Sequence, residues 1–319
     1  MSVFHEGEQF VQQRAGVGET AAELGARVVN HALSPRFSDF LSTQPFVIVA
    51  SGPPPGGMWA SILSGPPGFA RTVRPDRVVV EAKIQRSDPL TQSLASGPAA
   101  LGLLVLDPAG RRRIRLNGVG RSTSTGLEVD VLEVFGNCPK YIQKRRLCES
   151  LNAVSDDVST VGSSLNQEQR AVVERADTFF IASRHPERGA DASHRGGRPG
   201  FVTVADDGAS MTFPDYAGNN LFQTLGNLTV DPAIGLLFVD WSTGRALQLS
   251  GHAEIVWDGT RLANWPRARR LIDVRLRTVV DRSHASPLRW EFVEMHRFNP
   301  PVPEHDGASR PKDDGPQEH

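Results

Sequence analysis

Cysteine and long apolar runs are scarce in this sequence of 319 residues, and each scarcity excludes a class of protein. Two cysteines, Cys138 and Cys148, are too few for a zinc ribbon or a disulfide framework, so we expect free thiols in a reducing cytoplasm. The longest apolar run, residues 99–106, is far shorter than the ~20 residues that span a bilayer. The first eight residues are acidic and polar, without a signal-peptide core. We therefore expect no membrane anchor and no export signal.

An excess of charge of one sign is also missing, because 35 basic residues balance 36 acidic ones. Non-specific nucleic-acid binding needs a basic surface, so we expect no nucleic-acid partner. Thirty-one of the 35 basic residues are arginine and only four are lysine. Codon usage is the simpler explanation of this excess, and anion-binding chemistry is the alternative.

Common catalytic signatures are absent as well. The sequence has no Walker A loop, no Gly-x-Ser-x-Gly elbow and no His-Glu-x-x-His helix. Residues 16–21 spell a dinucleotide fingerprint, but residues 12–14 before them do not form a strand, so we interpret the stretch as a helix start. The nine histidines show no metal-ligand spacing, and we expect no metal site.

The chain contains an internal repeat. Residues 46–51 resemble residues 178–183, which lie 132 positions later. At an offset of 133, residues 102–107 resemble residues 235–240. A single one-residue shift between such matches predicts a tandem duplication.

Each repeat shows the pattern of β-strands. Short runs of Val, Ile, Leu and Phe end in Gly, Pro, Asp or Ser. The predicted strands are residues 46–51, 58–64, 78–83, 101–107, 113–119 and 127–135 in the first unit, and 178–184, 200–205, 210–213, 235–241 and 245–257 in the second. Apolar and polar residues alternate in 113–118, so one face of that strand meets solvent or a partner. About six strands per unit with few helices favour antiparallel barrels or sandwiches that pack together.

Helices are the minor component. Helical spacing predicts helices over residues 20–33, 167–176 and 260–274, with Asn166 capping the second and Pro266 starting or kinking the third. The predicted organisation is an N-terminal helical segment (1–34), a first unit (35–150), a second unit with a C-terminal helix and strand (151–298), and a disordered tail (299–319).

One part of the second unit is richer in polar groups than a barrel needs. Its candidate binding residues are Ser193, His194, Arg195, Arg198, Pro214, Asp215, Tyr216, Asn219, Asn220 and Asn227. Guanidinium, hydroxyl and imidazole groups beside a Gly-Asn turn can hold a phosphate. A glycine-rich hairpin followed by an Asn-capped helix is the alternative. The equivalent residues of the first unit, 59–64 and 81–86, lack these groups, which favours an anion or cofactor site in one copy only.

A second candidate stretch closes the last strand of the first unit. Asn137 and Pro139 end this strand, and Pro139 predicts a helix start that presents Lys140 and Tyr141 on its first turn. Lys140 would then reach a phosphate or a flavin oxygen in the other unit, and a solvated basic face is the alternative. Cys138 has no partnering histidine, so we interpret it as a packing residue.

The sequence resembles a known family at these positions. Residues 136–143 and 214–228, together with the doubled barrel, are similar to the FMN-binding split-barrel group, and more narrowly to proteins labelled pyridoxamine 5′-phosphate oxidase-like. Residues 4–8 and 11–16 look typical of its two-copy members. The resemblance therefore covers roughly residues 4–258.

The resemblance implies a mainly β fold, in which two six-stranded antiparallel Greek-key split barrels pack as an intrachain pseudo-dimer with FMN in the groove between them. It places Ser193, His194 and Arg195 along the flavin ring or ribityl chain, and the three asparagines near the phosphate or ribityl end. The family's true oxidases carry an Arg-x-Val-Leu-Leu-Lys strand, which is missing here, so vitamin B6 oxidation is not implied. Relatives of the barrel also bind haem or a deazaflavin.

Together these features predict an FMN-dependent oxidoreductase with a small-molecule substrate and an electron donor such as a reduced nicotinamide. His194, Lys140 and Tyr141 are its only acid–base candidates, so a non-catalytic flavin or haem binding module is the alternative. A third hypothesis is a structural barrel whose cofactor site has been lost. Because one chain can supply both walls of the groove, we expect a monomeric pseudo-dimer or a homodimer.

Overall fold

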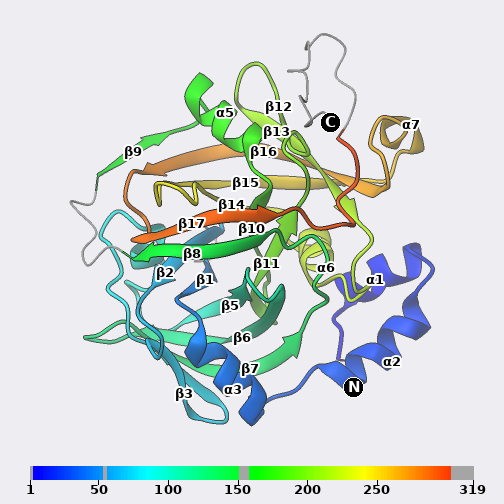
Figure 1. The fold of residues 1–319 in the computed structure, drawn as a ribbon. Coiled ribbons are helices and arrows are strands. Elements are labelled where there is room, and N and C mark those ends of the chain that lie inside the picture. Colours follow the sequence, from blue (N-terminus) through cyan, green and yellow to red (C-terminus); the bar gives the residue numbers. More distant parts are fainter. Residues whose placement is uncertain (1–2, 53–55, 151–157, 303–319) are drawn as a thin grey trace, which may run out of the picture.

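The computed structural model describes residues 3–52, 56–150 and 158–302 of the chain. Two large antiparallel sheets dominate it, one from each half of the sequence (Figure 1). The first sheet contains β1 (Phe46–Ser51), β2 (Trp59–Ser64), β3 (Ala70–Arg74), β4 (Arg77–Val80), β5 (Ala99–Asp107), β6 (Arg112–Ser122) and β7 (Leu127–Gly136). The second contains β10 (Thr178–His185), β11 (Gly189–Gly196), β12 (Thr203–Val204), β13 (Ser210–Tyr216), β14 (Ala233–Val239), β15 (Ala246–Val256) and β16 (Ala268–Arg282).

The two sheets have the same strand order. The first runs β2-β1-β5-β6-β7-β4-β3, and the second runs β11-β10-β14-β15-β16-β13-β12. In each, a meander of three strands is closed by an earlier strand, β4 beside β7 and β13 beside β16, which is a Greek-key arrangement. The predicted mainly β, tandem architecture is therefore confirmed. The first sheet has seven strands rather than six, and the second has eight, because β9 (Ser159–Gly162) pairs with β16.

Short helices surround the sheets. They are α1 (Glu6–Arg14), α2 (Gly18–Val28), α3 (Pro35–Thr43), α4 (Pro89–Ser93), α5 (Gln167–Arg175), α6 (Gln223–Val230) and α7 (Gly259–Leu262). The predicted α5 is confirmed: Asn166 caps it, and the side chain of Gln169 returns the bond in a capping box. The helix predicted over 20–33 is α2, which starts two residues earlier and ends five residues earlier.

Two predicted helices are wrong. Residues 268–274 begin strand β16, because the single-turn α7 ends at Leu262 and Arg267 adopts a left-handed backbone (φ 61°) that directs the chain into the sheet. No helix starts at Pro139, since Tyr141 is also left-handed (φ 66°) and the chain continues into β8 (Lys144–Ser150). Strand β8 pairs with β17 (Leu288–Glu294), so the end of the first unit is joined to the last strand of the second.

The two units share a core and approach each other closely at two equivalent glycines. One apolar cluster combines side chains of β1 and β5 with side chains of β10 and β14. A Cβ atom at Gly102 of β5 would lie 2.7 Å from the backbone N of Ala192 in β11. A Cβ atom at Gly235 of β14 would lie 2.7 Å from the backbone of Met58, next to β2. Glycine at both positions lets the sheets pack as a pseudo-two-fold pair.

Several further expectations concern the ends and the thiols. Residues 303–319 of the predicted tail lie outside the described residues, whereas Asn299, at its start, is buried and donates to Gln143 at 2.9 Å. Cys138 and Cys148 are free. None of the helices described is long and apolar enough to cross a membrane. The domain limits given above stay predictions.

Candidate functional site

A cleft opens where the two units meet, beside the start of α6. Strand β6 and the segment after β7 form one wall, and β11, β13 and the loop that leads into α6 form the other. Nine predicted site residues line it: Asn137, Tyr141, His194, Arg195, Pro214, Asp215, Tyr216, Asn219 and Asn220. Its empty space, with the open mouth included, is about 720 Å³. Residues of both units therefore meet in one cleft.

The other four predicted site residues do not line this cleft. Ser193 is fully buried beside it, where its hydroxyl accepts a hydrogen bond from Thr224 at 3.0 Å. Asn227 is buried on α6 and faces a neighbouring hollow. Lys140 lies in a different surface groove, and Arg198 is exposed. Ser193 thus supports the cleft through its neighbours, and the other three belong to other surfaces.

Two arginines of β6 line the cleft and were missed by the sequence prediction. Arg113 and Arg115 alternate with apolar residues, so their side chains share one face of the strand. Arg115 donates to both carboxylate oxygens of Asp191 in β11, at 3.0 and 3.2 Å, and both side chains are buried. The alternation in the sequence showed a polar face, but only the packing of the units shows that this face meets β11.

The cleft carries an excess of positive charge. Four arginines surround it, Arg113, Arg115, Arg195 and Arg270, against the two aspartates Asp191 and Asp215. Asp215 accepts from Arg270 at 2.6 Å and lies 3.9 Å from Arg195. Arg113 has no carboxylate partner among the described residues and donates instead to Nδ1 of His194 at 2.9 Å. An anion in the cleft would balance this charge.

Burial changes the pKa values of three of these groups. Desolvation lowers the pKa of Arg113 to about 10, and the nearby Arg115 and Arg195 act in the same direction. The pKa of His194 lies well below its ordinary value, first because the ring is buried and then because Arg113 lies beside it. Desolvation also lowers the pKa of Arg195. His194 is therefore neutral at pH 7, and a bound anion would raise all three pKa values.

Six buried polar atoms at this cleft have no hydrogen-bond partner in the described structure. They are Nε of Arg113, Arg115 and Arg195, Nε2 of His194, and both amide atoms of Asn137. Because Arg113 can only donate, Nδ1 of His194 is an acceptor and its Nε2 carries the proton. Buried polar atoms in folded proteins are almost always paired. These atoms, mostly donors, fit a ligand that brings several acceptor oxygens.

Backbone strain also gathers at the cleft. Tyr141, Asn220 and Phe222 have φ values of 66°, 62° and 63°, and all three line it. Non-glycine residues adopt this conformation at a cost and often do so at functional sites. The ring of Tyr141 lies 5.4 Å from that of Tyr216, and its hydroxyl donates to the carbonyl of Ala217 at 3.0 Å. The rim is thus a pair of aromatic rings held by a strained loop.

The start of α6 is open toward the cleft. Its N-cap residue is Phe222, which makes no side-chain cap, so the first backbone N–H groups have no side-chain partner. The side chain of Asn219 accepts from the N–H of Leu221 at 3.2 Å and therefore does not cap the helix. The Asn-capped helix, which was the alternative to an anion or cofactor site in this stretch, is therefore not found.

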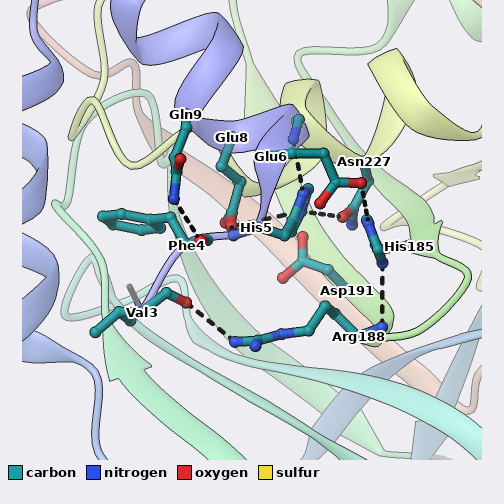
Figure 2. Close-up of polar contacts among 12 residues, drawn as sticks. Val3, Phe4, His5, Glu6, Glu8, Gln9, His185, Arg188, Asp191 and Asn227 are labelled. Atoms are coloured by element: carbon teal, nitrogen blue, oxygen red, sulfur yellow. Dashed lines mark hydrogen bonds and ion pairs between the residues drawn. The ribbon is translucent and has the colours of Figure 1, made fainter. Parts of the chain in front are cut away.

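The N-terminal segment covers α6 and was not identified as part of the site region. A Cβ atom at Gly7 would lie 2.3 Å from the carbonyl oxygen of Gly226, so these glycines let α1 and α6 touch. His5 donates to Asn227 at 3.0 Å, and Glu8 is buried beside it (Figure 2). Desolvation raises the pKa of Glu8 to about 8 and lowers that of His5 to about 4. Both side chains are therefore largely uncharged at pH 7.

His5, Glu6 and His185 lie side by side and bring three potential metal ligands within 4.8 Å (Figure 2). Nδ1 of His5 accepts from the N–H of Gly7, and Nδ1 of His185 accepts from two N–H groups of the turn that follows it. Each ring therefore carries its proton on Nε2, which donates to Asn227 or to Glu6. A metal ion would have to displace these bonds, so we interpret the cluster as a hydrogen-bond network.

Comparison with known proteins finds a family match in the second half of the chain. Residues 165–289, which include α5 and the strands from β10 to β16, match the family described as pyridoxamine 5′-phosphate oxidase. The second unit is therefore similar to this family. The first unit repeats the strand order of the matched unit. The family match confirms the resemblance found in the sequence.

Several solved structures are similar to a part of the chain. A Clostridium acetobutylicum protein related to general stress protein 26, of the pyridoxinephosphate oxidase family, is 13% identical with a TM-score of 0.28, and the match covers 40% of this chain and 92% of that one. An FAD binding protein from Mycobacterium smegmatis is 14% identical with a TM-score of 0.26, covering 38% and 98%. HupZ of Group A Streptococcus is 13% identical with a TM-score of 0.31, covering 38% and 96%. No curated protein matches the chain.

Proposed function

We propose that the cleft binds FMN and that the protein is an FMN-dependent oxidoreductase. One observation carries this proposal: buried polar atoms without partners converge on a positively charged cleft between two split-barrel units. A ligand with several acceptor oxygens would satisfy those atoms. A phosphorylated flavin has such oxygens on its phosphate, its ribityl chain and its ring.

The arginines are the groups that we assign to the phosphate. Arg113 has no carboxylate partner among the described residues, and Arg195 shares Asp215 with Arg270, so two positive charges remain to be balanced. Guanidinium groups bind phosphate with geometry that suits two oxygens at once. The uncapped start of α6 adds backbone N–H donors beside them. A dianionic phosphate therefore matches the charge and the donors of the cleft.

The two tyrosines supply the planar surface that a flavin ring needs. Tyr141 and Tyr216 are the only tyrosines in the sequence, and both lie at the rim of this cleft. Burial raises the pKa of each, so both hydroxyls stay protonated at pH 7. When bound, the flavin would supply hydride transfer to or from a small-molecule substrate, with a reduced nicotinamide as the proposed electron donor. The protein would orient the ring and exclude water from its buried face.

His194 favours a flavin over a haem as the ligand. Its Nδ1 is occupied by Arg113, and its Nε2 carries a proton. A haem iron needs an unprotonated ring nitrogen. In this arrangement the ring can donate a hydrogen bond to a flavin oxygen but cannot ligate iron.

A non-catalytic flavin-binding module is the second candidate. The hydroxyl of Tyr141 already donates to a carbonyl, and His194 is too strongly depressed in pKa to act as an acid near pH 7. These two observations leave few groups to move a proton for a substrate. An oxidoreductase would then transfer hydride without a protein acid, and a carrier would need none.

Cofactor titration of the purified protein tests the proposal. We expect FMN to bind and its fluorescence to change, and we expect Arg195→Ala to weaken binding by about tenfold or more, since a hydrogen bond to a charged group contributes about 1.5–3 kcal/mol. Arg198→Ala is the matched control, because this arginine is exposed and outside the cleft. Protein that takes up no FMN would refute the proposal.

Anaerobic bleaching of the bound flavin separates the two candidate functions. Bleaching by NADH or NADPH would support the oxidoreductase, and flavin that stays oxidised would support the binding module.

A further inference from the structure

A second hollow lies on the first unit, between α3 and the adjoining ends of β6 and β7. Its empty space, with the open mouth included, is about 1560 Å³. Phe37 and Phe40 of α3 give it an apolar side, and Arg36 and Arg112 give it a charged side. It shares Arg113 and Asn137 with the cleft described above, so these two side chains separate the two spaces.

The internal repeat shows what fills the same place in the second unit. There Arg245 makes a bidentate ion pair with Asp281, at 2.8 and 2.6 Å, and also pairs with Glu168. Gln169 donates to Asp281 at 2.9 Å, and β9 lies along the same stretch of β16. We call this network of partly buried, paired groups the seal, because it fills the place that the hollow occupies in the first unit.

The strand pairings identify the matching residues of the first unit. Arg112 corresponds to Arg245, because β5 pairs with β6 as β14 pairs with β15. Gly136 corresponds to Asp281, because the two are paired with Ile114 and Leu247 at the same point of their sheets. The helices α3 and α5 stand 132 residues apart, so Arg36 and Phe37 correspond to Glu168 and Gln169. The first unit therefore lacks both carboxylates of the seal, since Arg36 replaces Glu168 and Gly136 replaces Asp281.

The changes leave the hollow cationic and apolar at once. Arg36 has no ion pair among the described residues, and neither has Arg113. Arg112 pairs with Asp107 at 2.9 Å, and its guanidinium lies over the ring of Phe40, 5.0 Å from the centroid. One acidic residue, Asp39, also lines the hollow. Arginine beside an aromatic ring suits a ligand that joins a flat apolar body to a negative charge.

We propose that this hollow is the binding site of a small aromatic anion, such as an aromatic carboxylate or sulfonate. The ring of the ligand packs between Phe37 and Phe40, and its charged group meets Arg36 and Arg112 in place of the carboxylates that seal the second unit. Arg113 and Asn137 form the wall that the hollow shares with the cleft, and the contacts proposed for this ligand do not use them. This site stands independently of flavin binding.

Titration with 8-anilinonaphthalene-1-sulfonate, a fluorescent aromatic sulfonate, tests the proposal on the full chain. We expect saturable binding that salicylate displaces and uncharged salicyl alcohol does not. Restoring the seal with Gly136→Asp and Arg36→Glu together should weaken binding by about tenfold or more, as a reversal of local charge predicts. Gly136→Ala is the control, because its Cβ atom would lie 3.7 Å from the ring of Phe37, an ordinary contact.

Three results would overturn the proposal: no saturable binding to the wild-type protein, equal binding to the sealed variant and the control, or equal displacement by salicylate and salicyl alcohol. Thermal unfolding of each variant shows that it is folded. The FMN titration of the same samples keeps the two proposals apart, because Gly136 and Arg36 do not line the flavin cleft.

Discussion

The internal repeat creates two equivalent places between the units: one is an open cleft, and a buried ion pair fills the other. In the open cleft, Arg113 lies on β6 and Asn137 follows β7. The same pairing positions of the other copy hold Ala246 and Arg282. Arg282 crosses to the first unit and pairs with Asp88, and both side chains are only 2% exposed. One copy thus closes with a buried ion pair, and the other keeps unpaired arginines.

The buried polar groups of the closed place have hydrogen-bond partners, whereas several of those at the open cleft have none. Asp88 accepts from Ser61 on one oxygen and from Arg282 on the other, at 2.5 Å each. Gln248, the counterpart of Arg115, donates to the backbone of Ala60 at 3.0 Å. No side-chain atom of these residues is among the buried, unpartnered atoms of the described structure. The comparison teaches that a duplicated interface can use one copy for stability and keep the other for a ligand.

Breaking the buried pair gives the largest expected effect. Asp88→Ala leaves the guanidinium of Arg282 buried without its carboxylate, which costs about 3–5 kcal/mol of unfolding free energy. Urea denaturation measures this loss. Asp76→Ala, which removes an exposed ion pair with Arg74, is the control and should change stability little. A loss no larger than that of the control would show that the closed place does not hold the units together.

The two glycines at the contact between the units, Gly102 and Gly235, test whether the units pack with pseudo-two-fold symmetry. Gly102→Ala and Gly235→Ala each place a methyl group 2.7 Å from backbone of the opposite unit, so each should destabilise the protein by about 1–3 kcal/mol and by similar amounts. Gly259→Ala, with open space around its Cβ position, is the control. Thermal unfolding of the three variants provides the measurement. Markedly unequal losses at Gly102 and Gly235 would contradict a two-fold arrangement.

Much of the fold could be predicted because the repeat doubles each signal. Residues 46–51 and 178–183 both read as strands, and they are β1 and β10. The same offset pairs Ala60-Ser61 with Ala192-Ser193, so β11 was already implied, but its polar residues hid the strand pattern. The start of strand β16 was mistaken for a helix because buried and exposed residues do not alternate there: Arg270, Leu271 and Ile272 are all buried. Short-range patterns do not record which face the other unit covers.

The candidate site was predicted from residue types, and its cations were not all found. His194 and Arg195 stood out because the first unit has Ile62 and Leu63 at the same positions. Arg113 and Arg115 resembled an ordinary solvent-facing stripe of a strand. Their role depends on the packing of β6 against β11, a contact between segments about 80 residues apart that no local pattern encodes.

A buried carboxyl group distinguishes the open side further, where α1 packs on α6. The pKa of Glu8 is raised to about 8, so the stability it contributes is present below its ordinary pKa and is lost as the pH rises to about 8. Glu8→Gln keeps the acceptor for the N–H of His5 and removes the charge. We expect the variant to match the wild type near pH 5 and to exceed it increasingly as the pH rises to about 8, by about 1.4 kcal/mol per pH unit. The exposed Glu6→Gln is the control in urea denaturation at both pH values, and an advantage that does not grow with pH would exclude a buried, protonated Glu8.

The smallest expected change in stability is the most informative for function. Arg113 occupies the position of Ala246 without a carboxylate partner in the described structure, and desolvation lowers its pKa to about 10. Arg113→Met should therefore leave the stability of the ligand-free protein unchanged or raise it by about 1 kcal/mol, because it removes an uncompensated buried charge. The same change should weaken FMN binding by about tenfold or more, measured by fluorescence titration. If Arg113→Met instead destabilised the protein as strongly as Asp88→Ala, the arginines of the open cleft would be structural groups like those of the closed one, and the charge would no longer indicate a ligand.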